Sequence, residues 1–303
     1  MYYQETPYFT GDKIKILCPK ICGFKKENAQ FFLTSMQLTF SKFAWGSSQF
    51  NVNILEEQKV MLPVKKGEID FEFMENFIAE LEAQRYTELA AYLSTTGLQD
   101  THLSPEEEKA LADFDKASWS KFRIGALFER IMTQKLPYKA NDLPKQMTGK
   151  YVLPCLTSSF NNQGLNYYVP KEGATIIRDV ISIPSNSDVY RAYYQSNDFT
   201  VLSDAYAIRW NYNEIGLSRL QHLFAVASIN KVTDLPIYSY KNKLGGWNVV
   251  QNKYIQLPIK NGEIDFEFMN LLISAIQKLV IKDVVAYCET KLAATKKQDE
   301  ETN

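Results

Sequence analysis

The segment LPVKKGEIDFEFM, Leu62–Met74, occurs a second time in the chain as LPIKNGEIDFEFM, Leu257–Met269. Eleven of the thirteen positions are identical, at a constant offset of 195 residues. Repeats that stack into solenoids have periods of about 20–50 residues, so this longer period indicates duplication of a whole domain-sized unit. In the first copy, Asp70 or Glu68 is placed to act as the N-cap or first-turn acid of a following helix.

Weaker matches extend the duplication in both directions. Upstream, the matched residues are Tyr2-Tyr3-Gln4 with Tyr193-Tyr194-Gln195, and Asp12, Ile14 and Ile16 with Asp204, Tyr206 and Ile208. Downstream, apolar residues recur at spacings typical of one face of a helix. This predicted helix stripe comprises Met74, Ile78, Leu81, Leu89 and Tyr92 in the first copy, and Met269, Ile273, Ile276, Val284 and Tyr287 in the second.

The pattern of turn residues and apolar runs predicts an α+β chain in five parts. Runs rich in β-forming residues, at Lys13–Leu17, Phe31–Phe43 and Val60–Val64, predict a β-rich domain over residues 1–67. We expect a long helix and a polar connection over 68–117, and a second β-rich domain over 118–261. A second long helix follows over 262–296, and the polar residues 297–303 predict a disordered tail.

The net charge of −1 conceals a strong asymmetry along the chain. Residues 68–115 carry 13 acids and 2 bases, a net of −11. Residues 119–261 carry 17 bases and 9 acids, a net of +8, and residues 1–67 carry 9 bases and 5 acids, a net of +4. The predicted β-rich parts are therefore basic, which favours a polyanion-binding surface, although acidic helices are also common in ordinary soluble proteins.

Motifs for catalysis, metal binding or cofactor binding are missing from the sequence. The two histidines, His102 and His222, lie in unrelated regions, and Cys18 and Cys22 have no second pair at zinc spacing. There is no Gly-rich phosphate loop, serine elbow or AdoMet-binding motif. No apolar run reaches the roughly 20 residues of a membrane span, and Met1–Phe9 is unlike a signal peptide, so we expect a cytoplasmic protein without catalytic, cofactor or metal residues of its own.

The second basic part interleaves cations with aromatic and amide residues. Lys and Arg neutralise phosphates, whereas Arg and Asn form paired hydrogen bonds with base edges. Each of these residues alone is more often structural or merely solvating, so it is the set that favours nucleic-acid binding. The candidate DNA-binding residues are Asn161, Asn162, Tyr167, Lys171, Arg178, Arg191, Tyr193, Arg209, Lys241 and Lys243.

This layout resembles the specificity subunits of Type I restriction-modification systems and the target-recognition parts of Type IIB and IIG enzymes. The resemblance rests on WSKFRIGALFE at Trp119–Glu129, VLPCLTSS at Val152–Ser159, NNQG at Asn161–Gly164, and the Leu-Pro segment that precedes each predicted long helix. The order of these motifs together with the duplication is more specific than any one of them.

The resemblance implies two DNA recognition domains joined by two antiparallel spacer helices, in a non-catalytic chain. The implied partners are double-stranded DNA and a DNA methyltransferase subunit, which would hold AdoMet, with a restriction subunit and self-association as further candidates. Methyltransferase contacts would fall on the helices at Glu68–Leu93 and Glu263–Thr295. Residues 1–67 resemble only the C-terminal part of a recognition domain, which in full would begin about 70 residues earlier, judged by the usual size of a domain.

Two alternatives remain open at this point. In the first, the chain is a protein-interaction scaffold built on a coiled-coil helix pair. In the second, it is the recognition fragment of a larger single-chain restriction enzyme. DNA binding weakens steeply with added salt because counterions are released, whereas an apolar protein interface does not.

Overall fold

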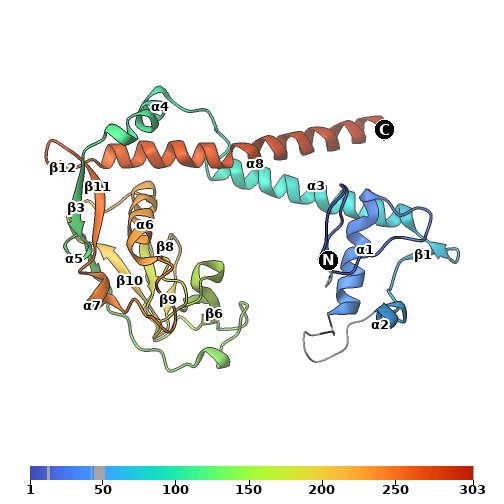
Figure 1. The fold of residues 1–303 in the computed structure, drawn as a ribbon, viewed down its shortest axis with the longest axis horizontal. Helices are drawn as coiled ribbons and strands as arrows, with labels where there is room; N and C mark the ends of the chain where they lie inside the picture. The colour runs from blue at the N-terminus through green and yellow to red at the C-terminus, as the bar shows by residue number, and fades with distance from the viewer. Residues whose placement is uncertain (12–13, 42, 44–51, 303) are drawn as a thin grey trace. The chain divides into compact units, whose positions relative to one another are not determined.

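The computed structural model describes residues 1–11, 14–41, 43 and 52–302. The chain divides into two compact units, which are described separately (Figure 1). Unit 1 comprises Met1–Asp100 and Ile281–Asn303, and unit 2 comprises Thr101–Val280. Both helices and strands are present, as the α+β prediction requires. No described helix is long and apolar enough to cross a membrane.

Unit 1 is built mainly from helices and one short hairpin. Its elements are α1 (Lys26–Phe40), α2 (Val52–Glu56), β1 (Val64–Lys65), β2 (Glu68–Ile69), α3 (Phe71–Thr95) and the later part of α8 (Phe266–Thr302). Helix α1 packs against the start of α3, where Phe32 meets Phe71 and the Asn28 amide donates to the Glu75 carboxylate. Met74 is fully buried at this end of α3.

The duplicated segment adopts the same structure in both copies. In unit 1 the hairpin pairs Val64 with Ile69 and Lys65 with Glu68; in unit 2, β11 and β12 pair the equivalent residues, Ile259 with Ile264 and Lys260 with Glu263. The two turn residues have positive φ in each copy, +54° and +88°, as a tight hairpin turn of this twist requires, and the second is glycine both times.

The helix that follows each hairpin also begins in the same way. The Asp70 carboxylate accepts a hydrogen bond from the Phe73 N–H at 2.9 Å, and the Asp265 carboxylate accepts one from Phe268 N–H at 2.9 Å. The predicted N-cap role of Asp70 is therefore confirmed. An aspartate in this position satisfies one of the unpaired N–H groups at a helix start and favours the positive end of the helix dipole.

Helix α3 and the later part of α8 form an antiparallel pair within unit 1 (Figure 1). Leu93, Val285 and Cys288 are buried between them, and Leu89, Ala90, Leu98, Ile281 and Leu292 pack around these three. The Tyr86 and Tyr287 rings meet edge-on, with centroids 5.8 Å apart. On α8 the buried positions fall at 281, 285, 288 and 292, the alternating spacing of four and three that packs one helix against another.

The predicted stripe identified this pair only in part. Leu89 packs in it, and Tyr287, although exposed, meets Tyr86 of α3. Leu81, Tyr92 and Val284 are exposed and lie outside the buried cluster. At Val284 the prediction is wrong by one position, because the buried residue is Val285 and a shift of one residue turns a helical side chain by about 100°.

The remaining residues of the stripe have other surroundings. Met269 and Ile273 belong to the core of unit 2, Ile276 is exposed, and Ile78 is half-buried. Because α8 begins in unit 2, its first turns pack against that core.

The prediction of a β-rich domain over residues 1–67 is wrong in its details. Phe31–Phe43 was expected to be extended, but Lys26–Phe40 is helical. Within the described part of 1–67, strand structure is confined to Val64–Lys65, and Lys13 lies outside the described residues. Helix α1 is favoured locally by the Asn28 side chain, which accepts a hydrogen bond from the Lys25 N–H at 3.0 Å at the start of the helix.

The predicted disordered tail is also not observed, because α8 continues to Thr302. Residues 297–302 are Lys, Gln, Asp, Glu, Glu and Thr, and the Lys, Gln and Glu among them are good helix formers that extend a helix already nucleated.

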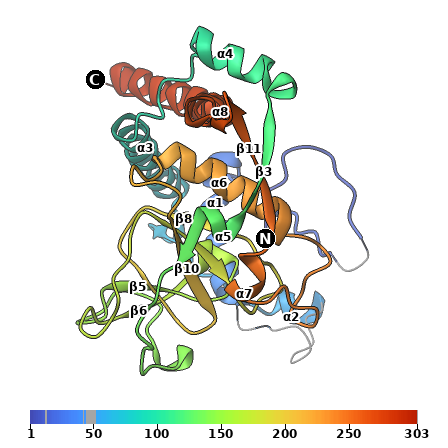
Figure 2. The same ribbon diagram turned by 90° about the vertical axis from the view of Figure 1, so that its left-hand side faces the viewer.

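Unit 2 contains three sheets and the helices that cover them (Figure 2). One sheet has the strand order β4 (Phe128–Arg130), β10 (Ala205–Trp210), β7 (Val180–Pro184), β8 (Tyr193–Gln195). A second has the order β12 (Glu263–Ile264), β11 (Tyr254–Lys260), β3 (Trp119–Arg123), and the third has β6 (Leu165–Val169), β5 (Leu153–Leu156), β9 (Thr200–Val201). The helical elements are α4 (Pro105–Ala112), η1 (Phe114–Lys116), α5 (Ile124–Leu127), η2 (Ala140–Asp142), η3 (Asn161–Gly164), α6 (Arg219–Thr233) and α7 (Trp247–Val250).

The main core of unit 2 lies between the first two sheets, α6 and the start of α8. Ile208 on β10, Ile255 on β11, Ile229 on α6 and Met269 on α8 are all buried in it. The predicted β-rich character of 118–261 is thus confirmed. This core fixes β8 and the loops beside it, which carry most of the candidate DNA-binding residues.

Candidate nucleic-acid interface

The turn at Asn161–Gly164 presents a row of exposed amide side chains. Asn162, Gln163 and Gly164 have φ values of +46°, +54° and +91°, a run of left-handed backbone that residues other than glycine adopt rarely. Gly164 is buried, and a Cβ there would lie 3.1 Å from the Thr157 carbonyl oxygen. The chain therefore turns tightly beneath Asn161, Asn162 and Gln163, whose side chains are exposed to solvent.

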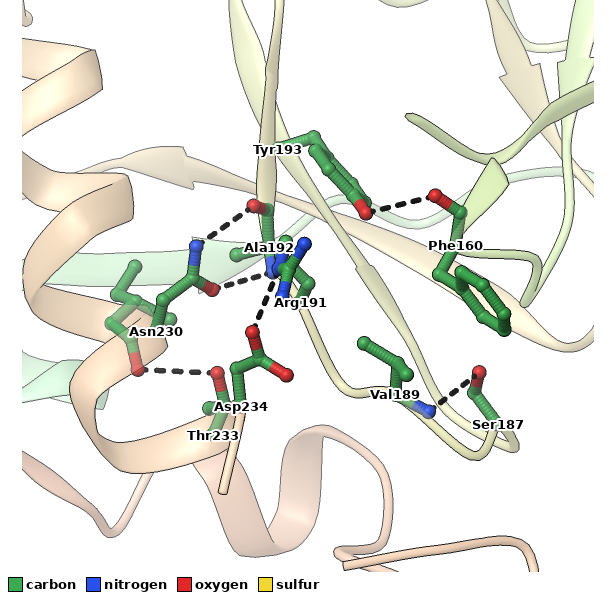
Figure 3. Close-up of polar contacts among 10 residues, drawn as sticks. Phe160, Ser187, Val189, Arg191, Ala192, Tyr193, Asn230, Thr233 and Asp234 are labelled. Carbon is green, nitrogen blue, oxygen red and sulfur yellow. Dashed lines mark hydrogen bonds and ion pairs between the residues drawn. The ribbon is translucent and has the colours of Figure 1, made fainter. Parts of the chain in front are cut away.

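Side chains of β8 hold this turn in place from the side. The Tyr193 hydroxyl donates to the Phe160 carbonyl oxygen at 3.1 Å (Figure 3), and the Gln195 amide donates to the Gln163 carbonyl oxygen at 3.2 Å. Both bonds reach the backbone of the turn and not its amide side chains, of which the Asn162 amide donates to the Leu165 carbonyl oxygen at 3.4 Å. Because burial raises the pKa of Tyr193, its hydroxyl remains a proton donor at neutral pH.

The residue before β8, Ala192, is hydrogen-bonded to α6. The Asn230 amide accepts from the Ala192 N–H at 2.7 Å and donates to the Ala192 carbonyl at 3.2 Å (Figure 3). Beside it, the Arg191 Nε donates to the Asp234 carboxylate at 2.7 Å, and this contact raises the pKa of the guanidinium further. Arg191 is exposed and binds Asp234 through its Nε (Figure 3).

A second loop with basic residues adjoins the β7–β8 connection. The Tyr240 N–H donates to the Asp188 carboxylate at 2.9 Å, and the Tyr190 ring meets the Tyr238 ring edge-on. Lys241 is exposed on this loop, and Lys243 lies over the Tyr240 ring at 4.8 Å. The β7–β8 connection thus links the turn at 161–164 with the loop at 238–243.

The structure therefore associates six of the ten candidate residues with β8 and its neighbouring loops. They are Asn161, Asn162, Arg191, Tyr193, Lys241 and Lys243. This group, with the exposed Phe160 and Gln163, is called the β8 surface below.

The other four candidates lie apart from these contacts or have structural roles. The Tyr167 ring packs against the small core beneath β5 and β6, and Lys171 is exposed on the following turn. Arg178 pairs with Asp198 at 3.1 Å at the other end of the β7–β8 hairpin. Arg209 on β10 forms a cross-strand ion pair with Glu129 on β4.

Sequence reasoning missed the residues that support the surface. Gln163 belongs to the same loop tip as Asn161 and Asn162, and a run of three amides before a glycine was a signal for including it. Gln195, Asn230 and Asp234 carried no such signal, because each acts through a contact with a residue at least 32 positions away.

Among the described residues, His222 has a structural role and no metal-binding cluster is found. His222 is buried, stacks on the Tyr194 ring at 4.7 Å, and its ring nitrogen lies 3.0 Å from the Ser218 carbonyl oxygen. Burial lowers the pKa of His222, so it is neutral at physiological pH and its role is in packing. No cluster of three or more His, Cys, Asp or Glu side chains with metal-binding geometry occurs among the described residues.

Comparison with known proteins points to one class. The family model described as Type I restriction modification DNA specificity domain matches residues 1–91. The chain is 22% identical over 282 residues to the specificity subunit S.BcgI of a Type II restriction enzyme from Heyndrickxia coagulans, covering 92% of this chain and 75% of that protein.

Two solved structures are also similar. The S subunit of a Type I restriction-modification system from M. genitalium aligns with 91% of this chain and 70% of its own, at 13% identity and a TM-score of 0.44. The HsdS subunit from Thermoanaerobacter tengcongensis aligns with 88% of this chain and 64% of its own, at 18% identity and a TM-score of 0.38. The family match over residues 1–91 and the similarity to S.BcgI along most of the chain agree with the duplicated hairpin-and-helix unit, and both matches are to specificity components of restriction-modification systems.

Proposed function

We propose that this chain is the DNA sequence-recognition subunit of a restriction-modification complex. It reads DNA through the β8 surface of unit 2 and docks a DNA methyltransferase subunit on its long helices. The chain itself is non-catalytic, and AdoMet is held by the methyltransferase partner. A restriction subunit is a further partner of the complete complex.

The observation that carries this proposal is the turn at Asn161–Gly164. Two hydrogen bonds from β8 reach its backbone and fix it, so its exposed amides are held ready for contact. Asn and Gln side chains form two hydrogen bonds with adenine in the major groove, and each such pair discriminates between bases by about 1–3 kcal/mol. A fixed turn loses little conformational entropy when it binds, which favours specificity.

Exposed cations on other loops of unit 2 supply the affinity that does not depend on sequence. Arg191, Lys241 and Lys243 are exposed beside the β7–β8 connection, and Lys171 lies on the turn after β6. Lysines of this kind neutralise phosphates and release counterions, and each phosphate contact adds about 0.9 to the slope of log K against log salt. Arg191, oriented by Asp234, is suited to a guanine edge or a phosphate, both of which accept two hydrogen bonds from a guanidinium.

Exposed aromatic residues support methyltransferase docking on α3. Phe31, Phe73 and Phe77 form one group, with ring centroids 5.9–6.3 Å apart, and Phe73 and Phe77 are nearly half exposed. Leu81 continues this stripe one turn further along the helix. An apolar patch of this kind on a soluble protein typically marks a protein interface.

The test of DNA recognition starts from the full chain purified with the methyltransferase subunit that accompanies it. Bound duplexes are selected from a random DNA pool, and the enriched motif is measured again with Asn161→Ala and with Asn248→Ala. Asn248 is an exposed asparagine on α7 and serves as the matched control. We expect Asn161→Ala to lose preference at one base position, with affinity for the enriched site falling about 5- to 150-fold, the equivalent of 1–3 kcal/mol.

A complex that enriches no motif would contradict the proposal and leave the scaffold alternative. Salt dependence separates the two, since a DNA complex weakens steeply between about 50 and 200 mM salt. Docking is tested with Phe77→Asp, which should abolish co-purification of the methyltransferase. Leu38→Asp, at an exposed leucine on α1 outside the stripe, should not.

A further inference from the structure

Because of the duplication, the helices and strands of unit 2 can be matched with segments of unit 1. Helices α1 and α6 are both 15 residues long, and their bounds differ by a constant 193 residues. At each start the side chain of the third helical residue accepts a hydrogen bond from the N-cap N–H, Asn28 in α1 and Gln221 in α6, and these two positions are also 193 apart. The upstream sequence matches then make residues 14–17 the counterpart of β10, and residues 59–65 the counterpart of β11.

The counterpart of β10 is uncovered. On β10, Tyr206 and Ile208 are 2% and 0% exposed, because this strand lies between β4 and β7 in the sheet. The matching Ile14 and Ile16 are 60% and 58% exposed. Residues 14–17 form no strand, and no described residue of unit 1 pairs with them as β4 and β7 pair with β10.

The counterpart of β11 shows the same difference. On β11, Ile255 and Leu257 are each 1% exposed, and the strand pairs along its length with β3 (Figure 2). The matching Val60 and Leu62 are only half-buried. Apart from the short hairpin β1–β2, the described part of unit 1 contains no strand that pairs with this segment.

Residues 14–17 border an apolar cleft of about 1340 Å³ in unit 1. Its walls come from the first residues of the chain, from 14–21 and from the face of α1 that carries Phe32, Met36 and Phe40. Met36 is the counterpart of Ile229, which is fully buried in the core of unit 2. The cleft therefore occupies the part of unit 1 that corresponds to the core of unit 2.

We propose that this cleft binds a polypeptide segment that forms β-strands and has the sequence pattern of residues 119–184. This segment would supply the equivalents of β3, β4 and β7. Such a segment would pair with residues 14–17 and 59–64 by backbone hydrogen bonds, as an added strand does at an open sheet edge, and its apolar side chains would fill the cleft. A second copy of this chain is not the occupant, because its own Ile124, Leu127 and Ile181 are fully buried in unit 2.

The test supplies the segment within the full chain. A second copy of residues 118–192, with its Cys155 changed to alanine, replaces Met1, so that Tyr2 follows it as Tyr193 follows Ala192. Amide hydrogen exchange is then measured at residues 14–17 in the fused and unfused proteins. A control fusion carries Ile181→Asp and Ile183→Asp in the added segment only, where both isoleucines would face the cleft.

We expect exchange at residues 14–17 to slow at least tenfold in the fusion and to remain fast in the control. Cys18 borders the cleft and is exposed, so in a Cys22→Ser background its reaction with a maleimide should slow in parallel. Unchanged exchange in the fusion, or equal protection in the control, would overturn the proposal. Protection that appears in the unfused chain as its concentration rises would overturn it in favour of self-association. No DNA enters this assay, so its result is independent of the DNA-recognition proposal.

Discussion

Two leucines on α3 test how unit 1 is held together. Leu93 is 3% exposed and packs with Val285 and Cys288 of α8, whereas Leu81, twelve residues earlier on the same helix, is 41% exposed. The sequence pattern predicted Leu81 as the residue of the helix pair. Changing each leucine to aspartate, the same substitution in the same helix, therefore tests whether Leu93, as in the structure, or Leu81, as the sequence pattern predicted, packs in the helix pair.

The expected magnitudes differ by several kcal/mol. Removing a buried leucine side chain costs about 2–5 kcal/mol in lost burial and residual cavity. Aspartate at position 93 would also place a carboxylate among apolar neighbours, a further cost of at least 1–3 kcal/mol if the group is left without a partner. At position 81, by contrast, aspartate changes only helix propensity and exposed surface, which together amount to about 0.5–1 kcal/mol.

The assay is local, because a chain of two units need not unfold in one step. Cys288 is buried in the helix pair, so its reaction with a thiol reagent reports opening of that pair. We expect Leu93→Asp to expose Cys288 without denaturant, and Leu81→Asp to leave its reaction as slow as in the unmodified chain. Equal reactivity of Cys288 in the two variants would refute the assignment of Leu93 to the pair.

Three further predictions concern unit 2. Burial alone would raise the pKa of Glu107, but hydrogen bonds from Ser274 and Lys278 lower it below its ordinary value of 4.5. This carboxylate therefore stabilises the fold above pH ~4.5, and less as pH falls through its lowered pKa. Glu107→Gln should cost about 2–3 kcal/mol in urea unfolding at pH 7, and this cost should shrink progressively as the pH of the measurement is lowered. Gly164→Ala should weaken DNA selection and cost about 1–2 kcal/mol more in unfolding than Gly173→Ala, because both have positive φ but only the first meets a backbone oxygen. Cys155, whose pKa burial raises to about 12, should react with thiol reagents only after unfolding, as mass spectrometry of the labelled native chain will show.

Local signals in the sequence predicted local structure well. The repeated Gly-Glu-Ile-Asp segment forms the same hairpin and helix cap in both units, because turn chemistry and capping act within a few residues. Ser104-Pro105 starts α4, as its capping pattern indicates.

Burial was harder to predict because it depends on what packs nearby. Phe31–Phe43 contains many β-forming residues, yet the hydrogen bond at the helix start and contacts with α3 favour a helix as far as Phe40. Val284 and Val285 are equally apolar, and only the partner helix decides which is buried. Intrinsic preference is a weak guide wherever tertiary packing opposes it.

For the site, the sequence indicated residue types but not their surroundings. Asn161, Asn162 and Tyr193 do meet at one turn, because loop tips rich in amides are exposed and β8 lies beside them. Arg178 and Arg209, in contrast, pair with carboxylates distant in sequence, and no local sequence pattern predicts these ion pairs.

These ion pairs reduce the sequence-independent attraction to DNA that the net positive charge of residues 119–261 would otherwise predict. A phosphate that approaches Arg178, Arg191 or Arg209 meets a guanidinium already bound to a carboxylate, so part of each new contact replaces an existing one. Attraction that is independent of sequence then comes mostly from the exposed lysines and is smaller than a net charge of +8 suggests. A paired guanidinium, however, is held in one orientation and loses less entropy when it binds two acceptors on a base edge. If these arginines contact DNA as proposed, charge compensation would lower affinity for arbitrary DNA more than affinity for the correct site, and sequence recognition requires such a difference.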